Sequence, residues 1–134
     1  MLELNLLALG TATMAAFLVS STWYGVLGAR MTALQGGQGA TGMPAGGPES
    51  WKIGVELLRS LTIATALAVL VSGLDVSAIP AGLGIALATW VAFPVTLLAG
   101  AVIWDNVPLG LAAIHAGDWL VKLLAVTAIA TVWH

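Results

Sequence analysis

The sequence predicts an all-α protein, a four-helix transmembrane bundle, and three observations support that prediction. The chain has 134 residues, of which 60% are hydrophobic and only 7% are charged, and its mean hydropathy is +1.03. A soluble domain carries about a quarter charged residues, so this chain could not cover a surface exposed to water. Four apolar runs each contain the roughly twenty residues that a membrane-spanning helix needs. We therefore treat residues 1–134 as one integral membrane domain.

The first apolar run, residues 4–27, is expected to be a retained membrane span. It starts with an acidic Met-Leu-Glu, whereas a secretory signal peptide would start with positive charge; a cleaved signal is the alternative. Small residues at every fourth position predict close helix packing in lipid: Ala8, Ala12, Ala16 and Ser20. Trp23 and Tyr24 follow Ser20 by one turn, and they are either interfacial anchors or the lining of an internal site.

Residues 28–50 are predicted to form a loop. Most of this stretch is rich in glycine, has no apolar period and is expected to be a mobile tether. It is not a phosphate loop, because no Gly-Lys-Ser/Thr sequence leads from it into a helix. The second span, residues 51–73, follows and carries its own row of small residues at a spacing of four: Ser60, Ala64, Ala68 and Ser72.

The third span covers residues 79–104 and is interrupted near its middle by a proline. Pro94 cannot donate to the Trp90 carbonyl, so a kink is predicted there, either a static one or a hinge. Small residues again recur every fourth position: Gly84, Ala88, Ala92, Thr96 and Gly100. A tight turn at residues 105–108 then leads into the fourth span, residues 109–133.

Ionisable residues inside the spans define the candidate site. A charge at the centre of a spanning helix costs roughly 2.5–3.5 kcal/mol on insertion scales, so such groups face the bundle interior and pair with one another. At about 1.5 Å per residue, Arg59 and Asp118 lie at similar depths, which predicts an ion pair between these two. Glu56 and His115 are expected to form a shallower layer. The predicted buried network is Glu56, Arg59, His115, Asp118 and Lys122, with Ser20, Trp23, Tyr24 and Trp119 as its lining.

The orientation follows from the few charges outside the spans. Arg30 and Lys52 flank the first loop, whereas Asp75 and Asp105 mark the second and third. The positive-inside rule then predicts that the glycine-rich loop is cytoplasmic and that both termini are outside. The expected location is the bacterial cytoplasmic (inner) membrane.

Two motifs resemble a known family. Trp23-Tyr24 closes the first span, and the last span reads Ile114-His115-Ala116-Gly117-Asp118-Trp119-Leu120. In these positions the chain resembles the bacterial membrane family catalogued as domain of unknown function 1761, whose members have a Trp-Tyr pair in helix one and an Asn-Ala-Gly-Tyr-His-like stretch in the last helix. This sequence has His115 at the Asn-like place and Asp118-Trp119 at the Tyr-His-like place. The resemblance implies a four-helix membrane protein and no assigned activity.

Three functional classes follow from these features. The first is a structural or accessory subunit that packs with itself or with a membrane partner. The second is an oligomeric proton- or ion-coupled transporter or channel that uses the network, since histidine changes charge near neutral pH. The third, an enzyme built on Glu56, His115 and Asp118, is disfavoured because the chain has no cysteine, no activated serine and no repeated metal spacing. No catalytic residue, metal or cofactor is predicted. A net charge of −2 excludes a basic nucleic-acid surface, so the expected partners are the lipid bilayer and membrane protein.

Overall fold

The computed structural model describes residues 4–35 and 50–133, and it confirms an all-α four-helix bundle. The first and second helices are α1, Leu6–Leu34, and α2, Ser50–Gly73. The third is built from α3, Ile79–Trp90, a π-helical turn η1, Val91–Val95, and α4, Thr96–Trp104. The fourth is α5, Leu109–Val132. All four are long and apolar enough to cross a membrane, so the chain is a small multi-pass membrane protein.

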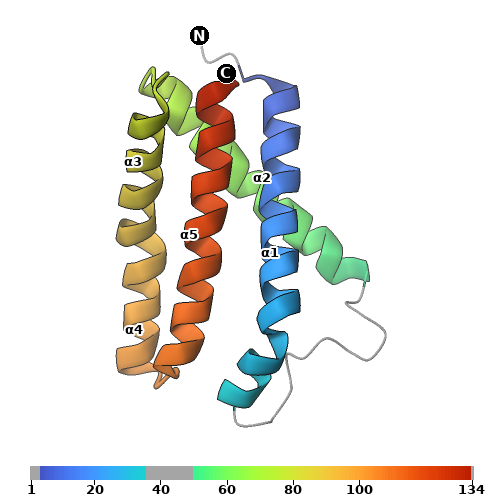
Figure 1. Ribbon diagram of the computed structural model, residues 1–134, viewed down its shortest axis with the longest axis vertical. Coiled ribbons are helices and arrows are strands. Elements are labelled where there is room, and N and C mark those ends of the chain that lie inside the picture. The colour runs from blue at the N-terminus through green and yellow to red at the C-terminus, as the bar shows by residue number, and fades with distance from the viewer. Residues whose placement is uncertain (1–3, 36–49, 134) are drawn as a thin grey trace.

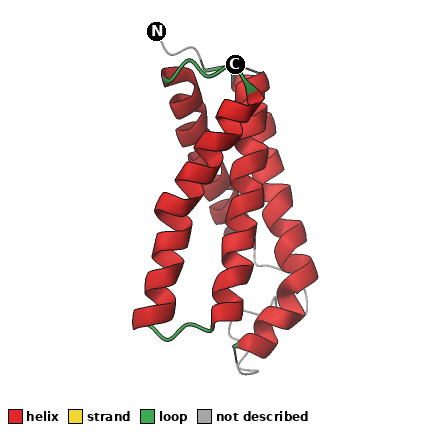
Figure 2. Ribbon diagram, turned by 60° about the vertical axis from the view of Figure 1, so that its left-hand side comes forward, coloured by secondary structure: helices red, strands yellow, loops and turns green. Residues whose placement is uncertain are grey.

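Helix α5 is the centre of the bundle. It packs against α1, α2 and α3, while α1 also packs against α2. In Figure 1, α5 runs between α1 and the α3–α4 helix, and α2 crosses behind them on a diagonal. The Leu6 end of α1 and the Val132 end of α5 lie at the same end of the bundle. At the other end α4 turns back into α5 through a short connection, seen in Figure 2.

Helix α1 begins two residues after the start of the predicted span and ends seven residues after its end. The side chain of Asn5 accepts hydrogen bonds from the backbone N–H groups of Leu7 and Ala8, which caps the first turn. The prediction of a loop from residue 28 is wrong, because the helix continues to Leu34. One internal glycine costs a helix only about 1 kcal/mol, and Leu34 packs beside Gly110 at the start of α5. Residues 36–49, where the mobile tether was predicted, lie outside the described residues.

Where the sequence predicts a kink, at Pro94, the structure has the π-helical turn η1. A proline removes one backbone donor from the helix, which frees a carbonyl upstream. Trp90 carries the carbonyl that loses its donor, and in the same turn the Thr96 hydroxyl donates to the Val91 carbonyl at 3.0 Å. The third helix continues through the proline, because α3, η1 and α4 follow one another without a gap.

The predicted rows of small residues coincide with the buried residues to a different extent in each helix. In α1 the buried residues are the predicted ones, Ala8, Ala12, Ala16 and Ser20. In α2, Ser60 and Ala64 are buried as predicted, but the buried face then moves to Leu67 and Val71. In the third helix Gly84, Ala88, Ala92 and Thr96 are exposed, so this row does not pack within the chain, and the buried residues are Gly82, Ala86 and Pro94. No charged residue in that span marks which face turns inward.

Candidate functional site

Asp118 on α5 is a buried carboxylate held from α1. The residue is only 2% exposed. The Ser20 hydroxyl donates to Oδ1 at 2.7 Å, and the Tyr24 hydroxyl donates to Oδ2 at 3.3 Å. The spacing of Ser20 and Tyr24, four residues apart, places both hydroxyls on one face of α1, toward α5. Both oxygens of the carboxylate therefore have donors, as a buried charge requires.

Lys122, one turn further along α5, is the most deeply buried charge among the described residues. It is 1% exposed, and its Nζ lies 3.5 Å from Asp118 Oδ2 and 3.6 Å from Glu56 Oε1. The same ammonium lies 5.3 Å from the centroid of the Trp119 ring, a cation–π distance. The two carboxylates come from different helices, so Lys122 joins α5 to α2 through Glu56.

Arg59 does not reach the centre of this network. Its Nη1 atom lies 2.9 Å from Glu56 Oε2, one turn away on the same helix. The prediction of a direct Arg59–Asp118 pair is wrong: within residues 50–133, Glu56 and Lys122 stand between these two groups. The prediction that Arg59 is buried is also wrong, since its side chain is 56% exposed. A long arginine side chain can keep its charged end outside the core.

His115 contacts α1 rather than Glu56. Its Nδ1 lies 2.8 Å from the Tyr24 hydroxyl oxygen, and the two rings are 5.6 Å apart. One assignment of protons satisfies all three groups: Nδ1–H donates to Tyr24, and the Tyr24 O–H donates to Asp118. The predicted shallower layer of Glu56 with His115 is therefore replaced by a His115–Tyr24–Asp118 chain, with Glu56 on the far side of Lys122.

Two indole groups attach α5 to its neighbours. Trp23 Nε1–H donates to the Ile114 carbonyl at 2.9 Å, and Trp90 Nε1–H donates to the Ala116 carbonyl at 2.8 Å. Gly117 lies against Trp23, where an added Cβ would be 2.5 Å from the ring. Trp23 was predicted to line the site, whereas the hydrogen bond of Trp90 was not predicted. It could have been expected from the sequence, because an indole N–H inside the bundle needs a hydrogen-bond acceptor.

The family of the chain can be stated once this geometry is known. The sequence model of DUF1761, a family described as protein of unknown function, matches residues 7–131. The chain belongs to the DUF1761 family. This confirms the resemblance found in Trp23-Tyr24 and in residues 114–120. No curated protein and no solved structure matches the chain.

The matched region of this DUF1761 protein includes the whole network. Its charged members, Glu56, Arg59, Asp118 and Lys122, carry two negative and two positive charges. The network is thus neutral with His115 uncharged, and it connects three of the four helices. In the described part of the chain, no three His, Asp or Glu side chains gather as metal ligands.

Two buried hydroxyls lie outside the network. Ser60 Oγ and Thr127 Oγ1 are fully buried and have no hydrogen-bond partner among the described residues. Each is thus a polar group that has lost water without gaining a protein contact, which costs about 1–3 kcal/mol. Ser60 was predicted only as a small packing residue, and Thr127 was missed.

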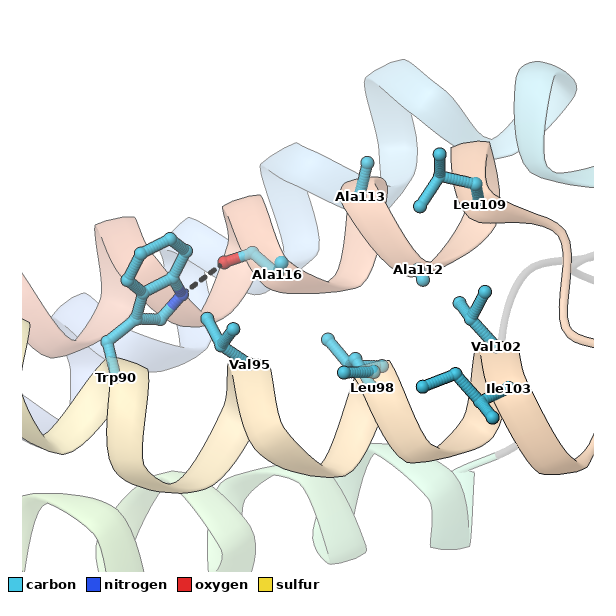
Figure 3. A pocket seen from close by; sticks show the side chains of 10 residues that line it. Trp90, Val95, Leu98, Val102, Ile103, Leu109, Ala112, Ala113 and Ala116 are labelled. Atoms are coloured by element: carbon cyan, nitrogen blue, oxygen red, sulfur yellow. Dashed lines mark hydrogen bonds between the residues drawn. The ribbon is translucent and has the colours of Figure 1, made fainter.

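The outer surface of this DUF1761 protein also carries an apolar groove. The groove has a volume of about 420 Å³ and lies between α4 and the first half of α5, with Trp90 at its inner end (Figure 3). Alanines from α5 line one side of it, and Val95, Leu98 and Ile103 line the other. No polar side chain apart from the Trp90 indole lies along it, and that N–H is already bonded to Ala116. The groove can therefore contact apolar chains, but none of its lining side chains could act as an acid, a base or a nucleophile.

Proposed function

We propose that this DUF1761 protein is a structural or accessory subunit of the bacterial cytoplasmic membrane, which packs with a second copy of itself or with another membrane protein. The observation that carries the proposal is the burial of Lys122 between two carboxylates that are themselves occupied by protein groups. A neutral network with its donors and acceptors matched fixes how α1, α2 and α5 meet. Buried polar groups have this specifying role in some systems.

The surface available to a partner lies on the third helix. In the most apolar 18-residue window of each span, 11% is buried within the chain for Ile79–Trp104, compared with 28% for α1 and for α5. Small residues on its exposed face, Gly84, Ala88 and Ala92, allow another helix backbone to approach closely in lipid. In this proposal the network holds the three-helix core together while α3 and α4 meet the partner.

The experiment is a measurement of mass after extraction in mild detergent or nanodiscs. The proposal predicts a complex larger than one chain. Ala88→Leu with Ala92→Leu should reduce the complex to a single chain, whereas Ala66→Leu, on an exposed position of α2, should leave it intact. A wild-type protein that stays a single chain and carries no partner through purification would refute the proposal.

A proton- or ion-coupled transporter or channel is the second candidate. The specific observation in its favour is a continuous series of polar contacts from exposed Arg59 through Glu56, Lys122 and Asp118 to Tyr24 and His115. Protein reconstituted in liposomes should then carry protons or ions down a gradient, and Lys122→Met should abolish that flux. Flux that is equal in empty and protein-containing liposomes would remove this candidate.

The proposal includes an orientation. Arg30 near the end of α1 and Lys52 near the start of α2 lie on either side of the first connection, and the positive-inside rule assigns that connection to the cytoplasm. A reporter fused at the C-terminus should therefore read as periplasmic, and a reporter inserted between α1 and α2 should read as cytoplasmic.

A further inference from the structure

A cavity of about 160 Å³ lies between α1 and α2, beside the polar network. Its polar lining consists of three hydroxyl groups from α1 and two charged side chains from α2: Ser20, Ser21, Tyr24, Lys52 and Glu56. Ser21 and Lys52 are exposed whereas Ser20 is buried, so the cavity leads inward from the surface to the network. The two helices cross one another in Figure 1, so the cavity lies between two membrane-spanning segments.

The lining suits a neutral ligand that both donates and accepts hydrogen bonds. The charges of the lining, on Lys52 and Glu56, sum to zero and so select neither an anion nor a cation. The Ser20 and Tyr24 hydroxyls donate to Asp118, which leaves their oxygen lone pairs to accept. Water meets these requirements, because it needs two to four polar partners and a volume of roughly 30 Å³ per molecule.

Glu56 is the charged group of the network that such water reaches. Its side chain is 25% exposed, compared with 3% for Asp118 and 1% for Lys122. Each Glu56 oxygen has one cation beside it, Arg59 at 2.9 Å and Lys122 at 3.6 Å. A carboxylate has about four lone-pair sites, so Glu56 can still accept hydrogen bonds from water.

The network is closed on its other side by apolar packing. Side chains from α1, α2 and α5 fill the bundle there, and each of these residues is at most 3% exposed: Ala12, Ala16, Ala64, Leu67, Leu123 and Val126. Along each helix they lie beyond the network toward the end of the bundle that holds the α2–α3 turn. Within the described residues, the cavity therefore gives access from the end where α1 ends and α2 begins.

We infer that this cavity holds water and that Glu56 exchanges protons through it with the aqueous phase on one side of the membrane. In this exchange a hydronium ion gives a proton to a Glu56 oxygen and leaves as water, and the reverse step returns the proton. Protonation removes the negative charge between Arg59 and Lys122. The charged and titratable groups around Glu56 are Lys52 and Arg59 on its own helix, Lys122 and Asp118 on α5, and Tyr24 on α1. The inference does not rest on the proposed function, because a structural subunit and a transporter can both hold such a cavity.

The test of the cavity uses single cysteines, because the chain has none of its own. Ser21 and Thr22 are neighbours on α1 and both are exposed, but Ser21 lines the cavity whereas Thr22 lines an apolar groove on another face of the helix. A charged, membrane-impermeant thiol reagent needs the thiolate, which apolar surroundings disfavour, so Ser21→Cys should be labelled at least about tenfold faster than Thr22→Cys in native membranes. Equal rates, whether fast or slow, would overturn the inference.

Two further cysteines test the one-sided access. Asp105→Cys lies in the turn between α4 and α5, at the end of the bundle where α2 begins, and Asp75→Cys lies in the turn between α2 and α3, at the opposite end. With the reagent on one side of sealed membranes, Ser21→Cys should be labelled from the side that labels Asp105→Cys. Labelling from the side of Asp75→Cys would contradict the inference.

Proton exchange itself is measured by infrared spectroscopy of the full chain in lipid. As the pH is lowered, the wild-type spectrum minus the Glu56→Gln spectrum should gain the C=O band of one protonated carboxyl, because all other carboxyl groups cancel. The same band should persist in Asp118→Asn. A difference spectrum without this band, or a band lost in Asp118→Asn and kept in Glu56→Gln, would overturn the assignment to Glu56.

Discussion

The Ser20 hydroxyl on α1 donates a 2.7 Å hydrogen bond to Asp118 on α5, and both residues are 2% exposed. Each of these residues would be costly inside a membrane without the other, because a buried carboxylate needs donors and a buried hydroxyl needs an acceptor. The same carboxylate also contacts Lys122, so one residue of α1 and one of α5 anchor the neutral network.

Serine at positions 20 and 60 should respond in opposite ways to alanine. Ser20→Ala removes a hydrogen bond to a charged group and should lower the free energy of unfolding by about 1.5–3 kcal/mol. Ser60→Ala removes a buried hydroxyl that has no partner among the described residues, so it should leave that free energy unchanged or raise it by up to about 1 kcal/mol. Unfolding in detergent, followed by tryptophan fluorescence, measures both. Equal losses in the two variants would show that Ser60 has a partner.

Gly117 should be intolerant of a methyl group. Its Cβ would lie 2.5 Å from the Trp23 ring, whose N–H is bonded to the Ile114 carbonyl and cannot move without losing that bond. Gly117→Ala should therefore cost about 1–3 kcal/mol, the usual penalty for overpacking. Gly54→Ala is the control: nothing lies within 4 Å of a Cβ there, and it is exposed on α2. The same melting experiment tests the pair, and a harmless Gly117→Ala would contradict the close α1–α5 contact.

Arg59 should contribute little to stability although it belongs to the charged set. Its side chain is 56% exposed and its pair with Glu56 is made within one helix. Exposed ion pairs are typically worth about 0–1 kcal/mol, so Arg59→Gln should lower the free energy of unfolding by no more than that. A loss of several kcal/mol in a chemical unfolding curve would mean that the guanidinium closes the network after all.

Much of the fold could be predicted because the spans are apolar and their ends are marked by prolines, glycines and charges. The inward face of α1 could also be predicted, since Ser20 is the polar end of a row of alanines. The third helix has no comparable residue that distinguishes its inward face. It carries no charged residue, so the sequence did not determine its rotation about its own axis; in the structure it turns Gly82 against Thr131 on α5.

The members of the site could be predicted more readily than their pairing. Helical depth places Arg59 and Lys122 on either side of Asp118, and it does not say which cation reaches the carboxylate. In the structure Arg59 pairs only with Glu56 on its own helix, whereas Lys122 contacts both Asp118 and Glu56. Lys122 lies one turn from Asp118 on α5, so this pair needs no adjustment between helices. The Tyr24–His115 contact depends on the angle and position at which α1 and α5 cross. The spacing of residues along one helix does not give that crossing geometry.

A double-mutant cycle on Asp118 and Lys122 tests the central claim, that a neutral buried network holds α1, α2 and α5 together. Asp118→Asn leaves the charged group at +1 and Lys122→Met leaves it at −1, and breaking a buried pair on one side typically costs about 3–5 kcal/mol. The double variant leaves Glu56 with Arg59, which is neutral again. We predict that its loss of unfolding free energy in detergent is smaller than the sum of the two single losses, by about 0.5–3 kcal/mol. Losses that simply add would contradict the network.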